Sequence, residues 1–165
     1  IMVNCLAVLT QTHHFARRFA KRGSGGLVLM GSLVGFQGAP LAGHYAATKA
    51  YIQSFAEALH RELKPLGVDV ISSAPGPTHS GFAESAGMTM ANAMAASKVA
   101  EQTLRALGYR ATVLPGILTK VLAYSLAMLP RHTRVFVMGK VMRGMVSSKD
   151  EGDEAGGGKA LRDAL

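Results

Sequence analysis

The sequence has no tryptophan and a single cysteine, Cys5, among its 165 residues. One thiol cannot form an intrachain disulfide, so a disulfide-stabilised secreted scaffold is excluded and a reducing, cytoplasmic location is expected. No signal peptide is visible, and the longest strongly apolar run, residues 121–129, is too short to span a bilayer. The adjacent His13 and His14 diverge on a helix, so no metal site is expected.

Acidic residues are also scarce, since ten of them stand against eighteen Lys and Arg and give a formal net charge of +8. Such an excess favours nucleic acids or anionic membranes as partners. The basic residues are scattered in small groups, however, and the aromatic residues are not interleaved with them for base stacking. We therefore expect no nucleic-acid binding and interpret the charge as solvated helix faces with an affinity for anions.

The remaining composition, 48% hydrophobic and 17% charged, is typical of a globular protein. Helical patterns alternate along it with short apolar runs. The predicted helices cover residues 4–22, 43–64 and, capped by Ser97, 97–107; the predicted strands cover residues 27–30, 68–71 and 111–114. This alternation predicts an α/β fold with a parallel sheet of three strands and flanking helices.

Two further helical patterns, residues 117–129 and 132–146, are separated by Pro130 and predict a C-terminal helix pair. We divide the chain into an α/β domain over residues 1–116, an apolar and basic helical extension over 117–146, and a tail over 147–165. The tail is rich in glycine and mixed charge, which predicts flexibility.

Tyr45 and Lys49 stand four residues apart in the long helix, which places a phenol and an ammonium on one helix face. A cation at roughly 6 Å favours phenolate by about 2.8 kcal/mol at an effective dielectric of about 20, or about two pKa units. Such a shift would move the phenol toward acid–base chemistry. Alone, the pattern is more typical of an exposed tyrosine beside a solvated lysine.

Three other polar features converge on the same edge of the predicted sheet. Ser32 follows the strand at 27–30, and the rigid turn Pro75-Gly76-Pro77-Thr78 follows the strand at 68–71. Ligands of open parallel sheets bind outside the carboxyl ends of the strands. Asn4 opens the first helix, where it is either an N-cap or part of this site, and Ser32 alternatively satisfies loop backbone.

Together these pieces resemble the short-chain dehydrogenase/reductase family. The matching residues are Asn4-Cys5-Leu6-Ala7, Gly31-Ser32 after an apolar strand, Tyr45-x-x-x-Lys49, and Pro75-Gly76-x-Thr78 after the next strand. The resemblance covers residues 1 to about 108 and implies a partial Rossmann-type, doubly wound sheet. It also implies a nicotinamide cofactor, NAD or NADP, and a carbonyl/alcohol substrate.

The resemblance also assigns roles to the matching residues. Tyr45 would exchange a proton with the substrate oxygen, which Ser32 would position. Lys49 would lower the Tyr45 pKa and bind the nicotinamide ribose. Asn4 would hold a water molecule that links Lys49 to solvent, and the Pro75–Thr78 turn, with Gly76, would meet the nicotinamide carboxamide.

The family's Gly-rich phosphate-binding turn precedes its Asn motif, and no such turn fits before Asn4. Residues 23–26 (Gly-Ser-Gly-Gly) do not replace it, because Val28 stands where the G-x-G-x-x-G fingerprint needs glycine and a strand follows instead of a helix. We therefore interpret the sequence, which begins with Ile, as a fragment that is inactive on its own and binds dinucleotide weakly or not at all. The strand at 27–30 is expected to expose an unpaired apolar edge.

Apolar residues cluster where the family has its substrate loop. They are Phe82, Met88, Met90 and Met94, and they predict either an adaptable wall for an apolar substrate or plain packing on the core.

The apolar, basic helices at 117–146 permit two interpretations. They are either a cap or subunit contact on the substrate side, which we favour, or a peripheral membrane contact. The alternative overall function is a non-catalytic remnant that acts as a membrane-surface or protein-interaction module. Helices 4–22 and 43–64 are candidate faces for a homo-oligomer.

Overall fold

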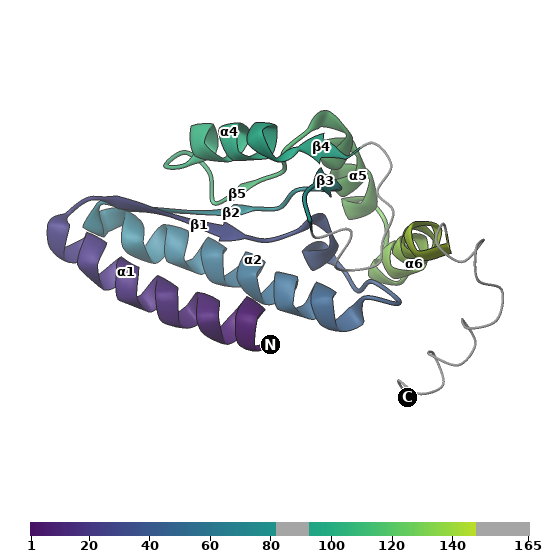
Figure 1. The fold of residues 1–165 in the computed structure, drawn as a ribbon, viewed down its shortest axis with the longest axis horizontal. Helices are drawn as coiled ribbons and strands as arrows, with labels where there is room; N and C mark the ends of the chain where they lie inside the picture. Colours follow the sequence, from purple (N-terminus) through teal and green to yellow (C-terminus); the bar gives the residue numbers. More distant parts are fainter. Residues whose placement is uncertain (82–92, 148–165) are drawn as a thin grey trace.

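The computed structural model describes residues 1–81 and 93–147, which alternate between helices and strands (Figure 1). A π-helical turn, Met2–Ala7, leads into the first helix, and 3₁₀ turns lie at Leu33–Phe36 and Lys64–Leu66. The helices are α1 (Val8–Arg22), α2 (Gly43–Leu63), α4 (Ala96–Ala106), α5 (Ile117–Ala127) and α6 (Arg131–Ser147). The strands are β1 (Gly25–Met30), β2 (Val68–Ser73), β3 (Thr78–His79), β4 (Met94–Ala95) and β5 (Thr112–Val113).

The main sheet has the strand order β1-β2-β5, and both pairings are parallel. β2 is the central strand, and Val68, Val70 and Ile71 in it are completely buried, as expected for a strand covered on both faces. β1 pairs through all six of its residues with β2. Within residues 1–81 and 93–147, its other edge has no strand partner, as the sequence predicts.

Helices cover both faces of this sheet, so the chain forms three layers (Figure 1). α1 and α2 lie side by side on one face, and α4 lies on the other. The core between α2 and the sheet contains Leu29, Ile52 and Ala56, together with the buried valines of β2. The predicted parallel α/β sheet with flanking helices is confirmed.

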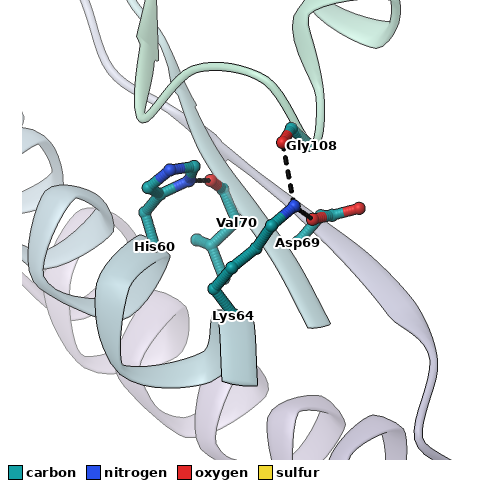
Figure 2. Close-up of polar contacts among 5 residues, drawn as sticks. All are labelled: His60, Lys64, Asp69, Val70 and Gly108. Atoms are coloured by element: carbon teal, nitrogen blue, oxygen red, sulfur yellow. Dashed lines mark hydrogen bonds and ion pairs between the residues drawn. The ribbon is translucent and has the colours of Figure 1, made fainter. Parts of the chain in front are cut away.

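β5 pairs only with Ser72 and Ser73, at the C-terminal end of β2. The N-terminal part of β2 is instead contacted by side chains from α2 and from the 3₁₀ turn that follows it (Figure 2). His60 places its Nδ1 2.8 Å from the Val70 carbonyl oxygen, so the ring N–H donates to the backbone of β2. The Lys64 ammonium donates to Asp69 at 2.6 Å and to the Gly108 carbonyl at 2.9 Å. These contacts tie the end of α2 to the turn after α4.

The helix pair packs against the loop that precedes α2. Met138 and Met142 of α6 are buried with Leu126 of α5 against Ala39 and Ala46. Burying each methionine contributes about 1.5–3 kcal/mol relative to exposure. The Arg134 side chain donates to the carbonyl oxygens of Ala127 and Leu129, both at 2.8 Å, and so caps the end of α5. The pair is therefore an integral layer beside the 31–42 loop.

Two helix-capping interpretations are excluded. Ser97 does not cap α4, because that helix already begins at Ala96 and Ala95 at its N-cap makes no side-chain capping bond. Of the two alternatives for Asn4, the N-cap is excluded, since Asn4 lies inside the Met2–Ala7 turn. The short parallel pair of β3 with β4, in which Thr78 pairs with Met94, was not predicted.

Gly35 lets the 3₁₀ turn lie directly on the backbone of α2. A Cβ at this position would stand 2.8 Å from both the carbonyl carbon and the oxygen of Lys49. Gly35→Ala is therefore expected to lower the free energy of unfolding by about 1–3 kcal/mol, because backbone cannot give way as a flexible side chain can. Urea unfolding measures the change.

Gly43→Ala is the matched control, because a Cβ there meets nothing within 4 Å. Alanine is also the better helix former, so this variant should unfold at an equal or higher urea concentration. Equal unfolding midpoints for the two variants would contradict the proposed close packing at Gly35.

Candidate active site

Ser32 lies at the carboxyl end of β1, where the chain leaves the sheet. Its hydroxyl oxygen accepts a hydrogen bond from the Val34 N–H at 3.4 Å and so begins the 3₁₀ turn. The next residue, Leu33, donates its N–H to the Pro75 carbonyl at 3.0 Å. The loops after β1 and β2 are thus joined directly, and Ser32 is held between them.

Tyr45 lies in the first turn of α2, half-buried, and its side chain is hydrogen-bonded to Ser32. The structure therefore brings together the two hydroxyl groups that the sequence places thirteen residues apart. Burial raises the pKa of Tyr45, and the hydrogen bond with Ser32 opposes that rise. At neutral pH the phenol is protonated and able to donate a hydrogen bond.

Lys49 follows one turn later on the same helix face, with its Nζ 5.5 Å from the centre of the Tyr45 ring. The ammonium donates to the Met30 carbonyl oxygen at 2.7 Å, at the end of β1. Burial lowers the pKa of Lys49, and the nearby Cys5 acts in the opposite direction. The pair alone predicts a lowered pKa for Tyr45, and that prediction is wrong: desolvation by burial raises the pKa, and the opposing contribution comes from Ser32.

Asn4 is connected to the same helix through Thr48, a residue that the sequence interpretation missed. Its side-chain amide donates to the Thr48 hydroxyl at 3.2 Å, and that hydroxyl donates to the Tyr45 carbonyl at 2.8 Å. Thr48 stands three residues after Tyr45, a spacing at which a threonine hydroxyl reaches back to the helix backbone. Asn4 is therefore bound to the residue that precedes Lys49, in the helical turn that begins at Tyr45.

The turn at Pro75–Thr78 closes the site at the end of β2. The Thr78 hydroxyl donates to the Gly76 carbonyl at 3.0 Å. A Cβ at Gly76 would stand 2.7 Å from the Thr119 hydroxyl, so α5 packs tightly on this turn. Thr78, Gly76 and Pro75 thus lie at the sheet edge that also carries Ser32.

The predicted substrate residues are only partly placed. Met94 lies in β4, where its N–H donates to the Pro77 carbonyl at 2.9 Å and its terminal methyl lies against Gly116. Met94 therefore lies beside the Pro75–Thr78 turn. Phe82, Met88 and Met90 lie outside the described residues.

The polar groups present fit the nicotinamide end of a dinucleotide. A phenol, a hydroxyl and an ammonium gather beside the ends of β1 and β2, where parallel sheets bind ligands. A glycine-rich connection, residues 31–42, does follow β1. A Cβ at Gly31 or Gly35 would meet Ser72 or the Lys49 backbone at 2.8 Å, so protein atoms fill the space that an open phosphate cradle needs.

Comparisons with known proteins agree with this geometry. Residues 1–104 match the short chain dehydrogenase family. A very-long-chain 3-oxoacyl-CoA reductase from Neurospora crassa is 39% identical over 70 residues, which are 42% of this chain and 21% of that protein. A solved 7beta-hydroxysteroid dehydrogenase superposes with a TM-score of 0.74 at 25% identity and covers 82% of this chain.

A short-chain dehydrogenase from Sphingobium yanoikuyae, solved in complex with NADPH, is 28% identical with a TM-score of 0.63 over 78% of this chain. The matched parts are 56% of the hydroxysteroid dehydrogenase and 52% of the Sphingobium protein, so the chain spans about half the length of these solved relatives. Since the family match covers residues 1–104 of 165, the chain belongs to the short chain dehydrogenase family.

Proposed function

We propose that this chain provides the catalytic part of an NAD(P)-dependent oxidoreductase that interconverts an apolar carbonyl compound and its alcohol. The observation that supports this most strongly is the hydrogen bond between Tyr45 and Ser32, with the Lys49 ammonium 5.5 Å from the phenol ring. These three groups come from α2 and from the loop after β1, and they meet at the ligand-binding edge of the sheet.

In the direction of reduction, the neutral Tyr45 phenol donates its proton to the substrate oxygen. Its raised pKa keeps it in the donating form at neutral pH. Ser32 donates a second hydrogen bond to the same oxygen and so positions it. The ammonium of Lys49 then stabilises the phenolate that remains, because opposite charges a few ångströms apart attract strongly in a partly buried site.

The remaining residues hold the cofactor and reload the proton. A bound nicotinamide cofactor supplies or accepts the hydride. Lys49, which has three N–H donors, would hold the ribose of the cofactor, and the turn at Pro75, Gly76 and Thr78 would hold its nicotinamide end. Asn4, which donates to Thr48, would hold a water molecule that returns a proton toward Lys49.

The names of the relatives support an apolar substrate. One relative is named a reductase of very-long-chain 3-oxoacyl-CoA and another a 7beta-hydroxysteroid dehydrogenase, and both named substrates carry large hydrocarbon portions. The side chain of Met94 beside the Pro75–Thr78 turn supplies an apolar wall for the substrate. The proposal includes Phe82, Met88 and Met90, which the sequence groups with Met94.

We expect the isolated 165-residue chain to show no saturable binding of NADH or NADPH by calorimetry at millimolar cofactor. Cofactor affinity in this fold comes largely from the pyrophosphate at a Gly-rich helix N-terminus, and the residues here reach only the nicotinamide end. A longer protein that joins this sequence to a strand, a Gly-rich turn and a helix should bind cofactor and reduce an apolar ketone.

The two outcomes separate the enzyme from a non-catalytic interaction module. Micromolar cofactor binding by the 165 residues alone would contradict the proposal that tight binding needs a further Gly-rich segment. Failure of the longer protein to reduce any ketone or 3-oxoacyl thioester, despite tight cofactor binding, would favour the non-catalytic module.

A further inference from the structure

The outer face of α5 is apolar and exposed to solvent. Ile117, Val121, Tyr124 and Met128 follow one another at spacings of four, three and four residues, so they form a single stripe along the helix. Their exposed fractions are 80%, 59%, 63% and 87%. The opposite face, with Thr119 and Leu126, is buried. A helix that is apolar on all sides is normally covered on all sides.

A groove beside this stripe adds aromatic and cationic groups. It lies between the end of α4 and α5 and has a volume of about 300 Å³. Tyr109 and Tyr124 line it together with Arg105, Arg110 and Lys120. Tyr109 is 87% exposed, so the groove presents an aromatic ring to solvent among three cations.

The charge of the whole chain is concentrated in this region. Residues 102–149 contain eight Lys and Arg and no Asp or Glu, whereas the rest of the sequence has ten of each kind, so the formal +8 belongs to residues 102–149. Within residues 1–81 and 93–147, Arg105 is the one cation of this region in an ion pair, an exposed contact with Glu101 at 2.6 Å. Within this region, Arg110 and Lys120 beside the groove are exposed, and no carboxylate of residues 102–149 compensates them.

We propose that the outer face of α5, together with the groove at the end of α4, binds to an anionic lipid surface. Apolar side chains enter the headgroup boundary, tyrosines suit that boundary because they have an apolar ring and a polar tip, and flanking cations meet anionic headgroups. None of the helices in the described part of the chain is both long and apolar enough to cross a bilayer. The contact is accordingly with one leaflet, and α5 lies along it.

A second copy of the chain fits this face less well. A twofold contact would place Lys120 and Arg110 of one copy near the same cations of the other, and residues 102–149 provide no carboxylate to compensate them. Like charges that face each other across an interface are costly. An anionic bilayer supplies the missing negative charge.

The experiment is sedimentation of the protein with sucrose-loaded phosphatidylcholine vesicles, with and without phosphatidylserine. We expect binding that requires phosphatidylserine and falls at high salt. The double variant Val121→Ser/Met128→Ser should weaken it by about tenfold, because exposed apolar area is lost while the buried face of α5 stays intact. Arg110→Glu/Lys120→Glu should weaken it by about tenfold or more.

The charge-matched control is Arg17→Glu/Arg18→Glu, on the exposed and equally basic α1. It should leave vesicle binding within about twofold of the parent protein, since α1 lies across the sheet from α4. An equal loss in this control would show charge attraction without a docking face and overturn the proposal. A second result would also overturn the proposal: Val121→Ser/Met128→Ser leaves vesicle binding unchanged but shifts the oligomeric state in sedimentation velocity. The outer face of α5 would then be a contact between copies of the chain.

Discussion

Tyr45→Phe should reduce turnover by roughly 10²–10⁴-fold in a protein that unites this chain with a cofactor-binding half. The substitution removes the phenol that the structure hydrogen-bonds to Ser32 but keeps the half-buried ring. The developing alkoxide then receives no proton from residue 45. The dissociation constant for NADPH should change by less than about threefold, because the ring and Lys49 remain. Steady-state kinetics and calorimetry on the same preparation separate these two quantities.

Tyr51→Phe is the control for loss of a phenol from the same helix. Tyr51 is exposed, and its ring stacks on Phe55 at 5.6 Å between centres, away from Ser32. This variant should retain nearly full turnover. Undiminished turnover in the Tyr45→Phe protein would exclude the proposed proton transfer, whatever the behaviour of the control.

Lys49→Met should damage turnover and cofactor binding together. The methionine keeps much of the apolar stem but removes the ammonium that lies over the Tyr45 ring and donates to the Met30 carbonyl. Loss of charge-assisted hydrogen bonds to the ribose hydroxyls, at about 1.5–3 kcal/mol, corresponds to roughly 10–100-fold weaker cofactor binding. Turnover should fall by a further 10-fold or more, since the phenolate loses its stabilising charge.

The direction in which the pH profile shifts in Lys49→Met distinguishes a charge effect of Lys49 on Tyr45 from simple packing. Without the cation, formation of phenolate at Tyr45 becomes more costly, so the rise of the alcohol-oxidation rate with pH should move to higher pH. Lys64→Met is the matched control. It removes an ammonium that lies in the 3₁₀ turn after α2 and is bound to Asp69 and Gly108. This control should leave cofactor affinity and the pH profile unchanged. If Lys49→Met also left the pH profile unchanged, Lys49 would have a structural role only.

The sequence predicts the sheet and the site edge because local patterns decide them. Short apolar runs bounded by glycine specify buried parallel strands, and the i, i+4 spacing of Tyr45 and Lys49 follows from the helix period alone. The encounter of Ser32 with Tyr45 was foreseeable because Ser32 follows the end of a strand and the family resemblance assigns both residues to one substrate oxygen. The bond between the Leu33 N–H and the Pro75 carbonyl, which fixes that encounter, has no side-chain signature and was not predicted.

Features that depend on tertiary surroundings were missed or misjudged. The pKa of Tyr45 is raised because packing removes water from the phenol, a cost that the spacing of two residues cannot reveal. Ser97 is a good capping residue by type, but α4 begins one residue earlier, immediately after the β4 pairing of Ala95. The exposed outer face of α5 could likewise not be predicted, because apolar residues occur on all sides of this helix and do not show which side is buried.

Arg134 joins the two helices of the C-terminal pair through the last carbonyl groups of α5 and the turn that follows. On its inner side the pair packs on Ala39, which lies between Ser32 and Tyr45, and on Ala46, which follows Tyr45. The pair is thus one packed unit that contacts solvent on its outer side and the candidate catalytic loop on its inner side. By thermodynamic reciprocity, a partner that prefers one position of this unit would change the affinity for the proposed substrate by the same factor as that substrate changes the affinity for the partner.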